Sequence, residues 1–380
     1  MKLLYLTNIP APYRIKRYND MVKVFSDYDI EFEVMFMSKS EPDRDWTVNE
    51  SEMQFPYKIW PGLHPTIKKF YAHFNPTLLW RLKKHDYDII IIAGISTPTL
   101  ILAPYFVGKG PFKVISVETN LRGDTTKTGL KKWLKGKLLG KADGYQVTGE
   151  LQKEYITFFS EDAKDKPFIK LPNLINGKKF REESLLSIDQ KLAIKDKYGL
   201  PHNVLLCIIP ARLVDIKYPD ALLRAMPQIK GVHFVLVGSG PIEQKVKEVA
   251  LKSAATMIPF QPEDEMVKLY GIADMFCLAS ITDASPLTTI EAICCGLPML
   301  VSDRIGNIGD VLEEGKNGFS FSPYDESGII EAFNKMVSLS DEDRTDMRRH
   351  SYQMFQNTFD NETCLANYAQ QILNVLNKRK

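Results

Sequence analysis

Two carboxylates, Asp283 and Glu291, stand eight residues apart in the second half of the chain. Between them, Ser285 is a good helix N-cap and Pro286 suits the first helical position, and the Gly-Leu-Pro sequence at 296–298 is typical of a helix end. The sequence therefore predicts a short helix that starts just after the first acid and carries the second.

The first turn of this helix is suited to binding an anion. The backbone N–H groups of Leu287, Thr288 and Thr289 have no partner inside the helix and lie at the positive end of its dipole, which favours a phosphate. Glu291 follows Pro286 by about 8 Å along the helix axis. An anion site between two carboxylates fits a ligand with a central diphosphate and a hydroxyl-bearing ring at each end, such as a nucleotide-sugar.

This arrangement of an acid, seven residues, a glutamate and a closing Gly-x-Pro resembles the E-x(7)-E motif of retaining glycosyltransferases of the GT-B fold, in particular glycosyltransferase family 4. The resemblance implies that Asp283 holds the donor sugar and that Glu291 holds the ribose. The first position departs from the family, because aspartate replaces the usual glutamate and is one methylene shorter. The alternative is a capped helix on which Glu291 is only solvated.

A segment with two basic residues, Arg212 and Lys217, follows the strand expected at Val204–Ile209. It resembles the family's Gly-Arg-Leu…Lys-Gly segment, with Ala211 and Tyr218 where glycines are usual. Arg212 and Lys217 would share one strand-to-helix loop. Two cations there can neutralise a diphosphate and the negative charge that develops as it leaves.

Two further loops complete the expected donor site. Gly238, Ser239 and Gly240 end a strand and resemble the family's Gly-x-Gly-Pro loop, whereas a dinucleotide fingerprint would need a glycine where Glu243 stands. Phe260 lies in a strand and loop where such enzymes place main-chain contacts to the base. No Walker A sequence occurs in the chain, which argues against a P-loop nucleotidase.

The first half alternates short apolar runs with periodic segments, which is the pattern of a parallel sheet covered on both faces. We expect strands at Leu3–Leu6, Ile30–Met37, Asp88–Ile92, Lys113–Val117 and Tyr145–Val147. Open sheets of this kind bind ligands at the carboxyl ends of their strands.

Two polar residues follow strands in this half. Arg14 ends a Pro-rich loop after the first strand that resembles the version found in a subset of family 4, and it either meets a phosphate or lies exposed on the next helix. Glu118 stands where many family members carry the histidine of a His-Asp pair. It is expected either to contact the acceptor hydroxyl, as a polar or catalytic group, or to cap its loop.

The stretch Lys127–Lys141 contains six lysines, a tryptophan, several leucines and no acid. A basic amphipathic helix of this composition suits an anionic membrane surface. The alternative is a solvated helix that packs on the sheet through Leu130, Trp133 and Leu134. A nucleic-acid partner is not expected, because no nucleic-acid motif accompanies the lysines.

Bulk composition agrees with a globular protein whose halves differ in charge. Apolar residues make up 44% of the chain, and no uninterrupted apolar run is long enough to span a membrane. The first 180 residues carry a net charge of +8 and the remainder −6, which points to a negatively charged partner for the first half. The five cysteines lack metal-ligand spacing and are expected to be core thiols.

Together these observations predict an α/β protein of GT-B architecture, with two Rossmann-like domains whose parallel sheets face a central cleft. Residues 1–182 would bind the acceptor, residues 183–360 the nucleotide-sugar, and a helix within 361–380 would pack back on the first domain. A polar linker is expected at about 177–190. The N-terminus reads as a first strand and not as a signal peptide, so we expect a cytoplasmic protein that lies on the inner face of the cell membrane.

By resemblance, the activity is transfer of a sugar, with retention of configuration, from a nucleotide-sugar to a glycan or lipid-linked acceptor in bacterial surface polysaccharide synthesis. UDP is the expected nucleotide by family frequency, and neither a cofactor nor a metal is expected. Two alternatives stay open: a non-hydrolysing UDP-sugar epimerase and a catalytically degenerate scaffold subunit. The epimerase would need a histidine near the sugar, and the first half offers only His64, His73 and His85, none at a predicted strand end.

Overall fold

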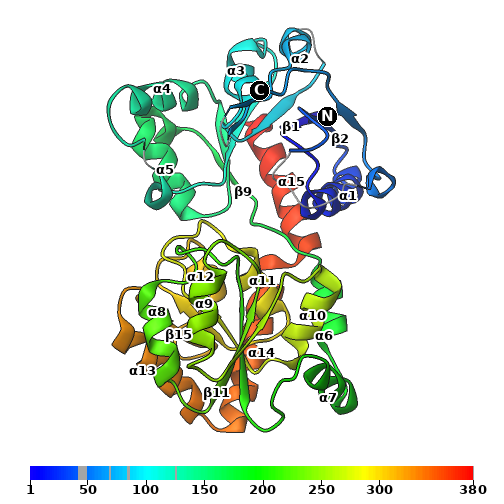
Figure 1. The fold of residues 1–380 in the computed structure, drawn as a ribbon. Helices are drawn as coiled ribbons and strands as arrows, with labels where there is room; N and C mark the ends of the chain where they lie inside the picture. Colours follow the sequence, from blue (N-terminus) through cyan, green and yellow to red (C-terminus); the bar gives the residue numbers. More distant parts are fainter. Residues whose placement is uncertain (42–48, 68–69, 84–85, 125, 380) are drawn as a thin grey trace. The chain divides into compact units, whose positions relative to one another are not determined.

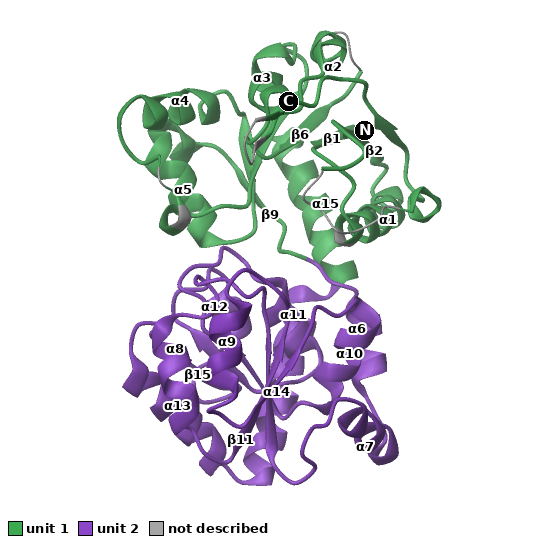
Figure 2. Ribbon diagram, viewed as in Figure 1, with its two compact units in different colours: residues 1–173, 361–380 green, residues 174–360 purple. Residues whose placement is uncertain are grey.

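The computed structural model describes the chain except for residues 42–48, 68–69, 84–85, 125 and 380. It divides into two compact units (Figure 2). Unit 1 comprises Met1–Asn173 together with Asn361–Lys380, and unit 2 comprises Leu174–Asp360.

Unit 1 is built on a seven-stranded parallel sheet in the order β3-β2-β1-β6-β7-β8-β9 (Figure 1). Its strands are β1 (Lys2–Thr7), β2 (Glu31–Phe36), β3 (Tyr57–Ile59), β6 (Ile89–Ala93), β7 (Phe112–Val117), β8 (Gly144–Val147) and β9 (Phe168–Lys170). A short antiparallel pair, β4 (Thr66–Ile67) and β5 (Phe70–Tyr71), precedes α2. The order runs outward in both directions from β1 and β6, as in doubly wound sheets.

The helices of unit 1 cover both faces of this sheet. They are α1 (Pro12–Ser26), α2 (Pro76–Arg81), α3 (Pro98–Phe106), α4 (Gly129–Leu139), α5 (Glu150–Phe159) and α15 (Asn361–Asn377). Alternate strand residues point to opposite faces, so Leu4 and Ile90 pack toward α2 and α3. On the other face, Tyr5 meets Tyr18 of α1, and Phe25 of α1 stacks on Tyr368 of α15.

Unit 2 repeats the plan with a six-stranded parallel sheet in the order β12-β11-β10-β13-β14-β15. The strands are β10 (Leu205–Pro210), β11 (Val232–Val237), β12 (Ala255–Ile258), β13 (Met275–Leu278), β14 (Met299–Ser302) and β15 (Gly318–Phe321). The helices are α6 (Gly177–Ser184), α7 (Ile188–Lys197), α8 (Asp220–Ala225), α9 (Glu243–Ala250), α10 (Glu263–Ile272), α11 (Leu287–Cys294), α12 (Ile308–Val311), α13 (Glu326–Ser338) and α14 (Asp341–Phe359). Ile208 and Phe276 face the α10 and α11 side, and Cys207 and Cys277 face the α8 and α13 side.

The predicted α/β class and the predicted strands are confirmed, with bounds that shift by one or two residues. Two local predictions are wrong. The polar stretch expected as a linker contains α6, whose Phe180 is buried in the unit 2 core. Arg14, expected at the end of a Pro-rich loop, lies instead in α1, which begins at Pro12, because proline at the first helical position gives up only an N–H that has no helical partner.

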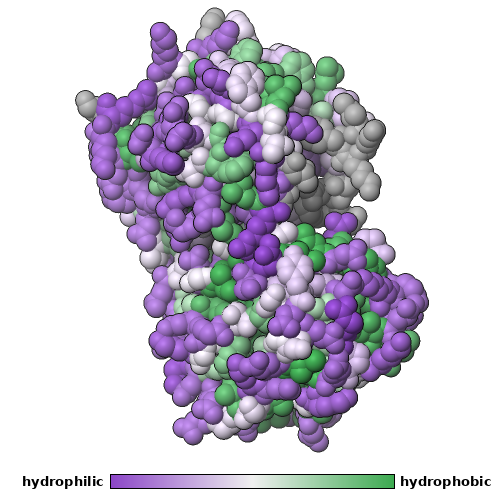
Figure 3. Space-filling view, turned by 90° about the vertical axis from the view of Figure 1, so that its left-hand side faces the viewer, coloured by the Kyte–Doolittle hydropathy of each residue, from purple (hydrophilic) through white to green (hydrophobic). Residues whose placement is uncertain are grey.

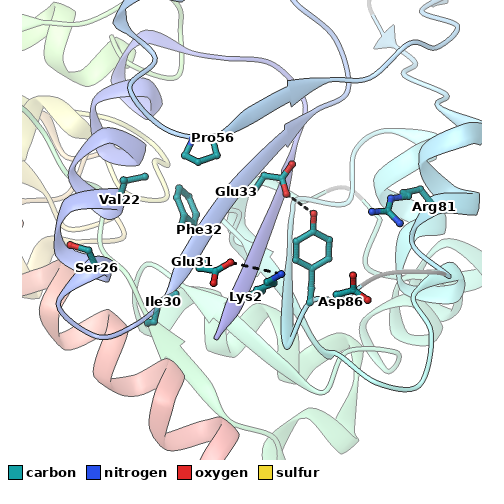
Figure 4. A pocket seen from close by; sticks show the side chains of 11 residues that line it. Lys2, Val22, Ser26, Ile30, Glu31, Phe32, Glu33, Pro56, Arg81 and Asp86 are labelled. Carbon is teal, nitrogen blue, oxygen red and sulfur yellow. Dashed lines mark hydrogen bonds and ion pairs between the residues drawn. The ribbon is translucent and has the colours of Figure 1, made fainter.

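A cavity of about 480 Å³ opens at the amino ends of β1 and β2 in unit 1 (Figure 4). In the close-up, Lys2 and Glu31 point toward one another, 3.9 Å apart. Glu33 accepts a hydrogen bond of 2.5 Å from the Tyr87 hydroxyl. Lys2, Glu31 and Glu33 are thus already engaged by other side chains, at the sheet edge opposite to the carboxyl ends where ligands bind in such folds.

Candidate functional site

Three loops of unit 2 meet at the carboxyl edge of its sheet, where β10 and β13 are neighbours and the strand order diverges. The Ile281 N–H, after β13, donates to the Ile216 carbonyl, after β10, at 2.8 Å. The Gly306 N–H, after β14, donates to the Asp283 carbonyl at 2.7 Å. These bonds fix the loop that carries the first acid at the topological switch point, the usual ligand site of open α/β sheets.

Lys217 and Asp283 form an ion pair across two of these loops. Each side chain is about one-fifth exposed, so the pair is partly shielded from water yet open to a ligand. The two residues are 66 positions apart in sequence, and the spacing of the motifs did not predict their contact. The structure therefore brings the expected diphosphate-binding lysine and the expected sugar-binding acid to one point.

Arg212 lies exposed on the loop after β10, and no hydrogen bond or ion pair engages its side chain within the described part of the chain. Its backbone is nevertheless fixed. The Ala211 N–H donates to the Val237 carbonyl at 3.0 Å, and the Leu213 N–H donates to the Ser239 carbonyl at 3.1 Å. A guanidinium whose loop is held in place and whose side chain is exposed is suited to binding a diphosphate.

The glycines of the Gly-Ser-Gly loop are required by packing. A Cβ on Gly238 would lie 2.2 Å from the Ala211 carbonyl oxygen, and one on Gly240 would lie 2.3 Å from that of Leu213. Gly238 also has a φ of +148°, which L side chains rarely adopt. The two glycines thus let the loops after β10 and β11 approach backbone to backbone.

Phe260 and Ser239 contact one another beside these glycines. The Phe260 N–H donates to the Ser239 hydroxyl at 3.3 Å, so this main-chain donor, expected to contact the base, is already engaged. The Phe260 ring is 75% exposed. The structure therefore leaves the ring, and not the N–H group, as the part of Phe260 that is open to a ligand.

The helix expected after Asp283 is α11, but it begins one residue late. Its N-cap is Pro286 and no side chain caps it, so Ser285 does not have the predicted capping role. Thr289 donates its hydroxyl to the Pro286 carbonyl at 2.7 Å and is fully buried. No described residue accepts a hydrogen bond from the backbone N–H of Leu287 or Thr288, as an anion site requires.

Glu291 extends from α11 toward α10, where its carboxylate accepts a 2.7 Å hydrogen bond from the Tyr270 hydroxyl. Burial raises the pKa of Glu291 to about 7, and the Tyr270 bond opposes that rise. The protonation state of this carboxyl therefore changes near neutral pH. A merely solvated glutamate, the alternative expected from the sequence, would not show this burial.

In unit 1, Glu118 and Arg14 come together at the carboxyl ends of β7 and β1. The Arg14 guanidinium lies 2.9 Å from the Glu118 carboxylate and also donates to the Thr7 hydroxyl at 2.9 Å. The Arg14 side chain is 16% exposed, so the expectation that it lies exposed on the next helix is wrong. Glu118 is 40% exposed and remains accessible from this edge.

The basic stretch forms α4, and its lysines have two different environments. Lys135 pairs with Asp124, which also accepts a 2.6 Å hydrogen bond from Tyr155 of α5. Lys131 and Lys137 are exposed, and Lys132 lies 4.1 Å from the Phe158 ring centroid. Lys135 is therefore partly buried and joins α4 to α5, whereas Lys131 and Lys137 are exposed.

The packing expected as the alternative for this stretch is wrong. Leu130, Trp133 and Leu134 are 69%, 57% and 52% exposed, and Leu138 and Leu139 are the side chains that enter the core. Figure 3 views the side on which α4 and α5 lie in Figure 1 and shows apolar side chains among hydrophilic ones there. Over the described residues, no helix is long and apolar enough to cross a membrane.

Comparison with known proteins agrees with this geometry. Residues 190–354 match the family model described as Glycosyl transferases group 1, and this range contains the whole candidate site of unit 2. The part of the chain that carries the candidate donor site is thus similar to the glycosyl transferases group 1 family. Glycosyl transferases group 1 is the family that the acid pair and the basic loop resemble.

Curated proteins that resemble this chain include two glycolipid or glycoside-forming enzymes, named by what they make or act on. Alpha-monoglucosyldiacylglycerol synthase of Acholeplasma laidlawii is 30% identical over 171 residues, 43% of this chain and 42% of that protein. D-inositol 3-phosphate glycosyltransferase of Mycolicibacterium smegmatis is 27% identical over 136 residues, 33% of this chain and 31% of that protein. The chain thus spans less than half the length of these curated relatives.

Solved structures match over the full chain. HepE of Anabaena in complex with UDP has a TM-score of 0.76 at 16% identity, with 100% of both chains covered. The lipopolysaccharide outer core galactosyltransferase WaaB, in its apo form, has a TM-score of 0.70 at 16% identity, also with 100% of both chains covered. The chain therefore has the GT-B fold.

Proposed function

We propose that this protein is a retaining glycosyltransferase that moves a sugar from a UDP-sugar to a glycan or lipid-linked acceptor. The Lys217–Asp283 ion pair carries the proposal, because it joins the loops after β10 and β13 just before the open first turn of α11. A cation, a carboxylate and free backbone donors at one edge match the diphosphate and the sugar of a single ligand. The HepE structures with UDP and with UDP-glucose favour uridine as the base.

In this proposal the side chains of unit 2 divide the donor between them. Arg212, Lys217 and the N–H groups of Leu287 and Thr288 bind the diphosphate and stabilise the negative charge that grows as its bond to the anomeric carbon breaks. Asp283 holds sugar hydroxyls. These groups supply the charge stabilisation that a divalent ion gives in other transferases.

The base and the ribose occupy the neighbouring loops. Glu291 accepts hydrogen bonds from the ribose hydroxyls, and the exposed ring of Phe260 offers an apolar face beside the Gly238 and Gly240 turn. Pro259, Gly238 and Met257 line a cavity of about 330 Å³ on this side of the sheet. A planar base fits between this ring and this cavity, because the faces of a base are apolar and its edge can form hydrogen bonds with main-chain groups.

The donor proposal has a direct test. UDP should raise the melting temperature of the protein, because a ligand that binds the folded state alone stabilises it. A screen of UDP-sugars should find one that releases UDP, and the rate should persist in excess EDTA because cations of the chain replace a metal. A rate that EDTA abolishes and Mg²⁺ or Mn²⁺ restores would contradict this account.

Unit 1 is proposed to bind the acceptor, with Glu118 as a polar contact for an acceptor hydroxyl. The exposed lysines and exposed apolar side chains of α4 fit an anionic lipid surface, on which a lipid-linked acceptor would be found. The name of one relative, a glucosyldiacylglycerol synthase, agrees with a lipid product. These features support our proposal that the protein works on the inner face of a bacterial membrane, in synthesis of a surface glycan.

Replacing Lys131, Lys132 and Lys137 by glutamate should abolish sedimentation with vesicles of anionic lipid. Each lysine near such a surface contributes about 1 kcal/mol, and the attraction should weaken as salt is added. Lys135 is left unchanged because its bond to Asp124 is partly buried.

The matched control replaces three exposed lysines of unit 1 outside α4, Lys2, Lys23 and Lys109, by glutamate. It changes the net charge by the same amount, so it separates a local surface from a general charge effect. Equal loss of sedimentation in both variants would assign binding to net charge and not to α4.

A further inference from the structure

Three side chains of unit 1 form a hydrogen-bonded chain that is separate from Glu118 and Arg14. The His73 Nε2 lies 2.9 Å from Glu41 Oε1, and the His73 Nδ1 lies 3.0 Å from the Nδ1 of His64. Glu41 and His73 are 8% and 2% exposed, whereas His64 lies at the surface. The chain thus runs from a buried carboxylate through a buried imidazole to a surface imidazole.

The backbone around this chain is firmly held. Leu63 and Phe74 exchange two backbone hydrogen bonds of 2.9 Å. Because His64 follows Leu63 and His73 precedes Phe74, these bonds bring the two histidines side by side. The His73 carbonyl accepts bonds of 3.0 Å from both the N–H and the hydroxyl of Thr99. Fully buried Asn75 donates to the Met37 carbonyl at 2.9 Å, and so ties this segment to the end of β2.

This position is the carboxyl edge of the unit 1 sheet. Glu41 follows β2 by five residues, and Thr99 lies in the first turn of α3, directly after β6. The same edge carries Thr7 and Glu118, after β1 and β7. An open α/β sheet presents its ligand site here.

The distances fix the tautomers when both imidazoles are neutral. Glu41, as a carboxylate, can only accept, so His73 carries its proton on Nε2 and leaves Nδ1 as an acceptor. His64 must then donate from its own Nδ1, which leaves its Nε2 with a free lone pair. Burial and the neighbouring His73 lower the pKa of His64, which favours this neutral state.

We propose that Glu41, His73 and His64 form a proton relay whose outlet is the surface Nε2 of His64, and that this nitrogen accepts the proton of an acceptor hydroxyl. The inference rests on the proposed function, because the hydroxyl is that of the sugar acceptor. His64 is the residue that contacts the substrate. His73 and Glu41 are positioning residues that set its tautomer.

The proton balance of the relay is complete within these three side chains. The hydroxyl proton moves to His64 Nε2 as the hydroxyl oxygen bonds to the anomeric carbon, and the diphosphate leaves with the electron pair of the broken bond. The Nδ1 proton of His64 moves to His73 Nδ1, so His64 stays neutral and His73 becomes an imidazolium beside the Glu41 carboxylate. The stored proton later returns to solvent by the same path. Among the described residues, the titratable groups hydrogen-bonded to either histidine side chain are the other histidine and Glu41.

The relay is tested first without any ligand, on the full chain with ¹⁵N-labelled histidine. At pH 8 the imidazole nitrogen shifts should show His64 protonated on Nδ1 and His73 on Nε2. In Glu41→Gln, the pH at which the pair takes up its proton should fall by about one to three units, because the opposite charge is lost. A His64 protonated on Nε2 at pH 8, or an unmoved titration in Glu41→Gln, would overturn the relay.

The role in transfer is tested with water as the hydroxyl probe, through UDP release from the UDP-sugar that the screen selects. His64→Gln should slow this release about a hundredfold at pH 8, with UDP binding unchanged, and Glu41→Gln should shift the pH profile of the rate. The matched control is His202→Gln in unit 2, whose imidazole also pairs with a carboxylate, Asp196, at 2.8 Å.

UDP release at the wild-type rate by His64→Gln would overturn the catalytic assignment. A wild-type protein that binds no UDP would instead defeat the proposed function. The nitrogen shifts would then still decide whether the relay itself exists, so the two failures are distinguishable.

Discussion

Replacing Lys217 by alanine should lower the turnover of sugar transfer by about a hundred- to a thousandfold, as loss of one preorganised donor to a developing negative charge does in other enzymes. The ammonium group sits on a loop held by backbone hydrogen bonds to β11 and to the loop after β13, and it pairs with Asp283. Its charge matters most as the bond to the sugar breaks. The loss should therefore appear in kcat more than in the affinity for UDP.

The matched control for this experiment is Lys245→Ala. Lys245 is an exposed lysine of the same unit, and it pairs with Asp220 at 2.7 Å and Asp215 at 3.4 Å, as Lys217 pairs with Asp283. Surface pairs of this kind contribute little, so turnover should not change. A Lys217→Ala enzyme with wild-type kcat would show that the lysine only orients Asp283.

The Lys217→Ala/Asp283→Ala double variant adds a further distinction. If the two side chains act on different parts of the donor, the free-energy losses of the single variants should add. If each serves only to position the other, the double variant should lose no more than either single variant.

Local sequence patterns predicted the elements that carry the site. Apolar runs such as Leu3–Leu6 and Val204–Ile209 lie within a residue of strands β1 and β10, because a buried parallel strand leaves a continuous apolar signal. The helix with Glu291 was also predicted, although its start moved from Pro286 to Leu287. These elements were predictable because the residues that indicate each strand or helix lie within a few positions of one another in the sequence.

Contacts between distant residues could not be predicted in this way. Lys217 and Asp283 are 66 positions apart, and Arg14 and Glu118 are 104 apart, so only the strand order brings each pair together. Lys135 belonged to a uniformly basic stretch, and nothing in its neighbours marked it as the partner of Asp124.

The histidine pair is a clear case of this limit. Neither His64 nor His73 follows a predicted strand, so the sequence does not predict that they lie near a sugar. The exchange of bonds between Leu63 and Phe74 nevertheless brings them to the carboxyl edge of the sheet. A short antiparallel pairing with few apolar residues leaves almost no periodic signal, so its partners emerge only from the folded backbone.

Glu291→Ala should weaken UDP and UDP-sugar alike, by about ten- to a hundredfold at pH 8, since a charge-assisted hydrogen bond to the ribose contributes roughly 1.5–3 kcal/mol. Asp283→Ala should leave UDP affinity nearly intact and lower turnover, because it orients the sugar and not the nucleotide. Calorimetric titration of both variants, beside turnover with the selected donor, separates the two roles. Glu331→Ala, an exposed acid on α13, is the matched control. Equal loss of UDP binding in both site variants would mean that Asp283 shapes the loop before α11 and does not hold the sugar.

The pKa of Glu291 adds a pH dependence whose sign is fixed. Because burial raises this pKa to about 7, the side chain is mostly a neutral acid at pH 6 and mostly a carboxylate at pH 8. Only the carboxylate accepts from both ribose hydroxyls, so the affinity should rise by up to about tenfold from pH 6 to pH 8, in proportion to the competent fraction. A UDP-sugar is the ligand of choice, since its diphosphate diester keeps the same charge over this range. Glu291→Gln cannot ionise and should bind with an affinity that is flat in pH. A wild-type affinity that is equally flat would show that the ribose is held by other groups, and would remove Glu291 from the donor site.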